Sequence, residues 1–315
     1  MCAKKYKYVC LIAICLISVA RLNAQTDVDA IMMNKYQFCN GLMYSHSSWN
    51  NYWEGTLKRS NENLGTVSTQ AVMYMGAYGI TDKLNVIIGA PYIWTKASAG
   101  TFHGLKGIQD ASAFIKWKPV SKAFGNNKIS LFILGGVSTP LSNYVIDYLP
   151  FSIGLGSTNV TARGMVDYWH KRWTVTGSAS YIRRSNVKLD RDAYYDTELQ
   201  ATNEVKMPDA AFYQLRAGYR GTYLIAEAIL SNMTTLGGFD ITRNNMPFPS
   251  NRMNATTVGV NIKYTLKNWT NLSLLAGANT TLSGRNMGQS KDYSAGVFYA
   301  FYFKNRKPVQ TNNLD

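Results

Sequence analysis

Three histidines and the hydroxyl groups near them are the residues that could perform acid–base or nucleophilic chemistry. His46 follows Ser45, His103 lies near Thr101, and His170 lies in a short connection between two expected strands. A catalytic base must be held within hydrogen-bond reach of its nucleophile, and closeness in sequence alone does not provide this. Hydroxyl groups are common in polar loops, so we expect no catalytic residues and no enzyme activity.

Metal-binding residues are also sparse in the sequence. Once a leader is removed, Cys39 is the only cysteine, and the three histidines are far apart. The acidic residues between Asp190 and Glu198 could bind calcium, but Arg191 lies among them and the glycine turn of an EF-hand loop is missing. A solvated, salt-bridged loop is the favoured interpretation, and we expect neither a metal nor a cofactor.

Charged and aromatic residues recur at alternate positions of the expected strands, on the face opposite the apolar one. If the apolar face contacts lipid, this second face lines the barrel lumen, because Arg or Lys facing lipid at mid-bilayer costs about 2–4 kcal/mol. The candidate lumen-lining residues are Asp110, Phe114, Lys116, Arg163, Asp167, Phe212, Arg216, Glu227 and Lys263. Lys118 and Arg220 fall on the same face near the rim, and the aromatic residues Phe132, Phe298 and Tyr302 also fall on this inward face. Two interpretations stay open: interior charges that pair and fill a narrow bore, or a net cationic ladder that favours anionic or hydroxylated solutes.

The strands themselves are predicted from alternation with a period of two. From Trp173 to Tyr181, apolar residues alternate with threonine and serine, which gives one apolar and one hydroxyl-rich face. The same pattern predicts an all-β fold, a transmembrane antiparallel β-barrel of about twelve strands. The expected strands are 37–44, 70–80, 84–94, 109–118, 128–138, 157–168, 173–183, 211–220, 222–230, 255–266, 271–283 and 291–303.

Short and long connections alternate between these strands. We expect short periplasmic turns, a somewhat longer connection at 119–127, and long extracellular loops that include 184–210 and 231–254. Short turns on the periplasmic side and long loops outside are typical of outer-membrane barrels. Both termini are therefore expected in the periplasm.

Tryptophans near the strand ends predict two aromatic girdles, one at each membrane interface. A soluble β-sandwich with capped strand ends is the alternative, but a bilayer explains both rows at once. The expected girdle residues are Trp94, Trp117, Trp169, Trp173 and Trp269.

The N-terminal residues have the pattern of a secretory signal peptide. Three lysines precede an apolar run, 9–20, which is too short to span a bilayer core of about 30 Å. We expect cleavage near Ala24, which divides the chain into a signal peptide (1–24), an N-terminal periplasmic segment (25–36), the barrel (37–303) and a C-terminal periplasmic tail (304–315).

The basic balance of the chain bears on its partners. Loss of the leader removes four of the 33 basic residues and none of the 18 acidic ones, which leaves a net charge of +11. An exported chain rarely meets nucleic acid, so we expect outer-membrane lipid and lipopolysaccharide, together with a small-molecule solute, as partners.

Three segments resemble one protein family. Residues 78–92 (YGITDKLNVIIGAPY), 107–117 (GIQDASAFIKW) and 150–157 (PFSIGLGS) resemble signature segments of the MetA-pathway of phenol degradation family of outer-membrane β-barrel proteins. Gln109 stands where a glycine would be expected. The resemblance implies a transporter-like barrel, and it carries over no binding site.

Two functions remain open on the sequence. The first is a monomeric outer-membrane channel or facilitator for small solutes that could be aromatic or hydrophobic. The second is a plugged structural or surface-interaction barrel that binds lipopolysaccharide or an envelope partner.

Overall fold

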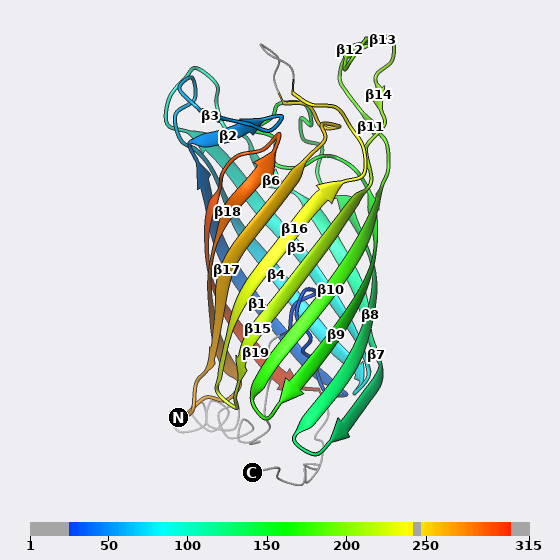
Figure 1. The fold of residues 1–315 in the computed structure, drawn as a ribbon, viewed down its shortest axis with the longest axis vertical. Coiled ribbons are helices and arrows are strands. Elements are labelled where there is room, and N and C mark those ends of the chain that lie inside the picture. The colour runs from blue at the N-terminus through cyan, green and yellow to red at the C-terminus, as the bar shows by residue number, and fades with distance from the viewer. Residues whose placement is uncertain (1–24, 242–246, 304–315) are drawn as a thin grey trace, which may run out of the picture.

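A computed structural model describes residues 25–241 and 247–303, and shows a closed antiparallel β-barrel (Figure 1). The predicted signal peptide and the predicted C-terminal tail lie outside the described residues. Twelve long strands of the described chain form the barrel wall, which confirms the predicted fold class. They are β1 (Gln37–Trp49), β4 (Val67–Thr81), β5 (Leu84–Ala97), β7 (Asp110–Phe124), β8 (Asn127–Pro140), β9 (Asn159–His170), β10 (Trp173–Arg184), β15 (Ala210–Arg220), β16 (Leu224–Thr235), β17 (Asn254–Thr265), β18 (Leu272–Arg285) and β19 (Lys291–Tyr302).

The barrel closes because its first and last long strands pair. β1 runs antiparallel to β19, with Gln37 opposite Tyr302 and Ser48 opposite Lys291. Each of the other long strands pairs with its neighbours in the sequence order of the long strands, so the barrel has up-and-down topology. Closure removes the sheet edges that a membrane could not satisfy.

Alternation along β10 shows which face is inside. Trp173 and Val175 are 65% and 44% exposed, whereas Thr174 and Thr176 between them are 2% and 1% exposed. The apolar residues therefore face outward and the hydroxyl groups face inward, as predicted. The same assignment holds for β17, where Val258, Val260 and Ile262 are exposed.

One expected connection is instead strand. Residues 119–127 were predicted as a longer turn, but β7 continues to Phe124 and turns at Gly125 into β8. The register shifts between Trp117 and Val120, so Lys118 and Pro119 form a bulge. A proline has no N–H for the sheet and is accepted at such a bulge, after which the strand resumes.

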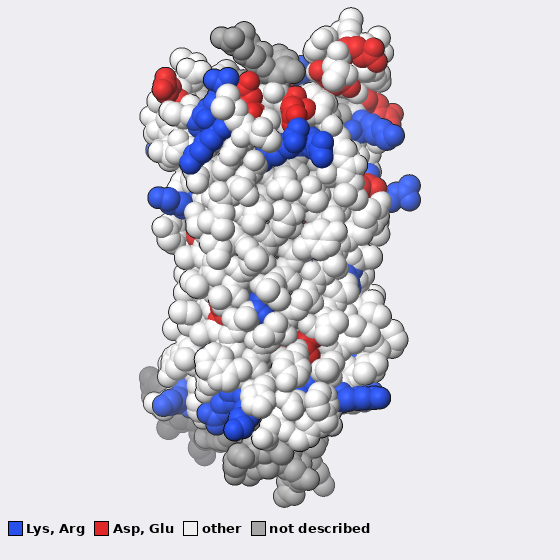
Figure 2. Space-filling model, viewed as in Figure 1, with Lys and Arg blue, Asp and Glu red and all other residues white. Residues whose placement is uncertain are grey.

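On the face shown in Figure 2, a belt of mostly uncharged residues covers the middle of the barrel, and charged residues gather toward its two ends. Exposed apolar side chains from successive strands supply this belt, among them Leu42, Ile115, Val166, Leu215 and Val297. This is the surface of an outer-membrane barrel, whose lipid contacts replace the usual core. No helix among the described residues is long and apolar enough to cross a membrane.

The long loops at the extracellular end of the barrel pack on one another. They carry the short strands β2 (Asn51–Glu54), β3 (Leu57–Ser60), β6 (Lys106–Ile108), β11 (Val187–Lys188), β12 (Tyr194–Tyr195), β13 (Leu199–Gln200) and β14 (Glu204–Val205). Val187, Val205, Met207 and Phe248 form a small buried cluster that joins two of the loops. The extracellular loops are therefore a packed layer rather than free coils.

The lipid belt gives a depth-dependent prediction. Val260→Arg, at the middle of β17, should lower the free energy of unfolding by about 2–4 kcal/mol, whereas Leu282→Arg, near the extracellular end of β18, should lower it by about 1 kcal/mol or less. Both side chains face outward in the barrel. Urea titration of folding into phospholipid vesicles measures both values, and equal losses would contradict the assignment of the belt.

Candidate functional site in the barrel lumen

Residues 25–36, which we call the strap, lie inside the barrel (Figure 1). The sequence suggested a periplasmic position for this segment, and the structure differs. The strap leaves the periplasmic end of β1, where the Tyr36 N–H donates to the carbonyl of Gly79, and enters the lumen. It does so because its polar groups find partners on the inner wall.

Lys116 is the main polar anchor of the strap. Its ammonium group donates to the backbone carbonyls of Thr26 (2.6 Å) and Asp29 (2.8 Å), and lies 3.3 Å from the Asp29 carboxylate. The carbonyl of Ile31 lies 3.4 Å away. Lys116 is fully buried, and a buried charge needs such partners to offset its desolvation.

A second cation holds the other acidic residue of the strap. The guanidinium of Arg163, on β9, donates to the carbonyl of Asp27 at 2.8 Å and lies 3.2 Å from its carboxylate. Gln25 completes the polar contacts, because its side chain hydrogen-bonds Asn85 on β5 at 2.7 Å. The strap therefore supplies anions to lumen cations from two different strands.

Apolar side chains of the inner wall also hold the strap. Met33 is fully buried in a cluster with Met75, Ile87 and Phe298, which point inward from β4, β5 and β19. Ala30 packs in a second cluster whose other buried members are Phe132, Leu134 and Met165. The inner wall thus places apolar side chains beside its charged ones, since Leu134 is paired with both Lys116 and Arg163 on the neighbouring strands.

The base of the strap rests on the hairpin between β4 and β5. A Cβ atom on Gly79 would collide with the carbonyl of Asn34, so only glycine permits this close approach. The backbone N–H of Lys35 donates to the Asp82 carboxylate at 2.9 Å. Gly79 and Asp82, both in the segment 78–92, therefore position the base of the strap.

The charges on β15 and β16 pair with one another. Glu227 accepts hydrogen bonds from Arg216 at 2.7 Å and from Arg220 at 2.7 Å. Arg220 also donates to Asp167 at 3.0 Å, and Asp167 accepts from the hydroxyl of Thr176 at 2.6 Å. All five side chains are buried, so this wall is a satisfied network.

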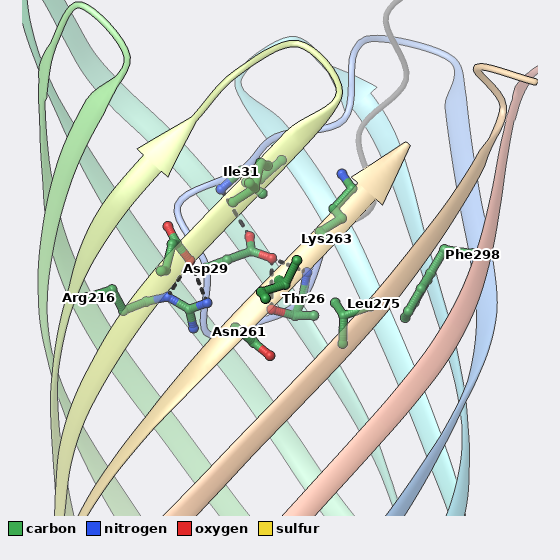
Figure 3. Close-up of a pocket in the computed structure, with 11 residues that line it drawn as sticks. Thr26, Asp29, Ile31, Arg216, Asn261, Lys263, Leu275 and Phe298 are labelled. Carbon is green, nitrogen blue, oxygen red and sulfur yellow. Dashed lines mark hydrogen bonds and ion pairs between the residues drawn. The ribbon is translucent and has the colours of Figure 1, made fainter. Parts of the chain in front are cut away.

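A small cavity of about 30 Å³ remains between the strap and this network (Figure 3). Asp29 and Ile31 line it from the strap, and Arg216, Lys263 and Phe298 line it from the wall. Such a cavity holds a water molecule rather than a solute. The lumen is therefore closed at the level of the strap.

The remaining lumen candidates lie at different heights. Phe114 packs against the Met33 cluster, and the ring of Phe212 lies under the Arg163 guanidinium, 5.9 Å from its centre. Lys263 is buried on the inner wall of β17. Asp110 is separate from the others, because it lies at the extracellular end and accepts a hydrogen bond from Tyr144 of a loop at 2.7 Å.

Four of the five predicted girdle tryptophans lie on the outer surface or in a turn, and one does not. Trp117 is exposed opposite Leu84, at the level of the periplasmic turn between β4 and β5, and Trp173 is exposed at the periplasmic end of β10. Trp269 is exposed in a turn, and Trp94 packs against Tyr44 outside near the loops. Trp169 faces inward, where its ring lies under Arg220 and its indole N–H donates to Asp167. Successive residues of a strand point to opposite faces, so residue 169 points to the same face as the inward Asp167. Closeness to a turn does not decide which face a residue takes.

Sequence reasoning missed the strap residues Asp27, Asp29 and Met33 as part of the site. Their signal was two carboxylates spaced by two residues ahead of a barrel whose expected inner face is rich in cations. The described ranges also contain no group of three histidine, cysteine or acidic side chains arranged to hold a metal ion.

Comparison with solved structures shows the fold that this chain shares. A scan against protein-family models and a search of curated proteins each gave no match. An outer-membrane channel from Pseudomonas putida F1 superposes with a TM-score of 0.70 at 14% identity, over 88% of this chain and all of that one. Two other barrels are more distant. The translocator domain of the autotransporter NalP from Neisseria meningitidis superposes with a TM-score of 0.45 at 9% identity, over 88% of this chain and 90% of that one. The CymD monoaromatic hydrocarbon channel superposes with a TM-score of 0.35 at 11% identity, over 87% of this chain and 90% of that one. The chain therefore has the fold of a bacterial outer-membrane β-barrel.

Proposed function

We propose that this protein is an outer-membrane channel for small solutes, and that the strap closes it. The observation that carries the proposal is the strap itself, a segment of twelve residues inside the lumen that belongs to no strand of the wall. If the leader is cleaved near Ala24, the strap has a free end and can leave without breaking the sheet. Support also comes from the fold of the Pseudomonas putida channel and from the resemblance of residues 78–92 to the phenol-degradation barrel family.

The inner wall suggests which solutes would pass once the strap has left. Departure would uncover Lys116 and Arg163 together with the apolar residues around Met75, Ile87 and Phe298. A lumen that offers both cations and apolar groups suits small hydrophobic or aromatic solutes, above all those that carry an anionic or hydroxyl group. The net cationic lumen predicted from the sequence thus belongs to the open state in this proposal.

The outer surface suggests the remaining partners. Lys96, Arg183 and Lys291 are exposed at the extracellular ends of their strands, and charged residues gather at this end of the barrel (Figure 2). Their ammonium and guanidinium groups are suited to the phosphates of lipopolysaccharide. We propose that the barrel works as a monomer with this lipid around it.

A structural or surface-interaction barrel is the second candidate. The loop cluster around Phe248 and the paired charges around Glu227 favour it, because both are satisfied contacts that would stabilise a permanently closed barrel. In that case the strap would be a fixed part of the core.

Lys116→Met distinguishes these functions. Methionine retains an unbranched apolar side chain but cannot bind the carbonyl groups of Thr26 and Asp29, so the strap should leave more often. We expect planar-bilayer recordings to show frequent openings for this variant and rare ones for the wild type, with the exposed Lys122→Met as the matched control. A Lys116→Met barrel that folds and conducts no more than Lys122→Met would favour the structural candidate.

A further inference from the structure

A second and larger cavity lies at the periplasmic end of the barrel, on the other side of the strap. It has a volume of about 290 Å³, near the lower end of the range for ligand sites of about 300–1,000 Å³. Lys118 from β7, Lys128 from β8 and Trp169 from β9 line it, and Ala30, Ile31 and Met32 of the strap form another wall. We call this cavity the vestibule.

Two ammonium groups in the vestibule lack a close anion. Neither Lys118 nor Lys128 forms an ion pair with a residue of 25–241 or 247–303; Lys128 repels Lys118, and the carboxylates of Asp82 and Asp167 attract Lys118 from beyond ion-pair distance. The acidic residues nearby have other partners: Asp167 pairs with Arg220 at 3.0 Å, and Asp82 accepts from the backbone of Lys35 at 2.9 Å. The bulge at Lys118 and Pro119 interrupts the pairing of β7 with β8 and keeps Lys118 on the inner face. Lys118 therefore lies on the same side of the wall as Lys128.

The rest of the vestibule lining has a polar part, which includes Asn34, Asp82, Ser130, Asp167 and Arg220, and an apolar or aromatic part. Ile31, Met32, Phe132 and Ile225 belong to the apolar part, and the ring of Trp169 lies against the cations, 5.8 Å from the Lys128 nitrogen. An anion alone would leave these surfaces uncovered. A molecule with a carboxylate at one end and a flat apolar body would satisfy both parts of the cavity.

We propose that the vestibule binds a small aromatic carboxylate, with its carboxylate between Lys118 and Lys128 and its ring against the strap. The site needs only the folded barrel with its strap in place, so it does not depend on whether the barrel conducts. A bound molecule would contact both wall and strap, and would therefore favour the closed state by mass action.

Isothermal titration of the detergent-solubilised full chain tests the site, with benzoate as the probe. Benzoate should bind more tightly than its neutral counterpart benzyl alcohol and more tightly than acetate, which lacks the ring. Lys118→Gln with Lys128→Gln should weaken benzoate binding tenfold or more, while Lys122→Gln, an exposed lysine of the same hairpin, should leave it unchanged. The heat-dependent gel migration of folded barrels shows that each variant is folded.

Three results would overturn the proposal. They are no binding of benzoate to the wild type, equal affinity for benzoate and benzyl alcohol or for benzoate and acetate, and an affinity of the folded double variant that equals that of Lys122→Gln. None of these results bears on conductance, so the vestibule and the channel can fail separately.

Discussion

Deletion of residues 25–35 is expected to raise the time-averaged conductance of the barrel about a hundredfold. Besides its apolar packing and neutral hydrogen bonds, the strap forms two charged contacts with the wall, Lys116 with Asp29 and Arg163 with Asp27. Hydrogen bonds to charged groups contribute about 1.5–3 kcal/mol each. Two such contacts at the lower value favour the closed state by about 3 kcal/mol, so the strap is outside the lumen for about 1% of the time. Removing the strap removes that equilibrium and leaves the lumen open.

Planar-bilayer recordings measure this effect directly. The deletion variant retains residues 1–24, so that export is unchanged, and begins its folded part at Tyr36. Asp27→Asn with Asp29→Asn provides a milder comparison, because it keeps the length of the strap and removes its charges. A folded deletion variant with the conductance of the wild type would show that another part of the barrel closes the lumen.

Glu227→Gln should lower the free energy of unfolding by about 3–5 kcal/mol, the usual effect of removing one member of a buried ion pair. Its carboxylate accepts from Arg216 and Arg220, and all three side chains are at least 95% buried. The substitution leaves Arg216 in a closed interior without its anion. Arg220 keeps Asp167, so the loss is centred on Arg216.

Urea titration of folding into phospholipid vesicles gives this value. Glu62→Gln, in an exposed loop, is the control and should change stability little. Arg216→Met combined with Glu227→Gln should recover much of the loss, because the uncompensated cation is gone. If Glu227→Gln were as stable as Glu62→Gln, the lumen around Arg216 would have to be open to water.

The wall of the barrel could be predicted from the sequence because lipid imposes a strict rule on it. Each strand must place apolar groups outward at every second residue, as Val258, Val260 and Ile262 do in β17. That rule also placed Lys116, Arg163 and Glu227 on the inner face. Applied to β9, the same alternation places Trp169 on the inner face with Asp167, whereas its position next to a turn suggested the outer girdle.

The strap could not be predicted in the same way, since its contacts are set by the finished lumen. Asp29 meets Lys116 across 87 residues and Asp27 meets Arg163 across 136, and neither contact has a local pattern. The loop cluster of Val187, Val205 and Phe248 has the same origin: its members come together only after the strands have fixed the loop ends. Charge complementarity between strap and lumen was the one available signal.

The central claim, that the strap is a removable closure, is tested most directly by returning the strap as a separate molecule. A synthetic peptide of residues 25–35 is added to the periplasmic side of the bilayer, where the short turns lie, while current flows through the barrel that lacks the strap. We predict a reversible block that depends on peptide concentration and weakens when Asp27 and Asp29 are both replaced by asparagine. A current that is the same with and without the peptide would contradict the account.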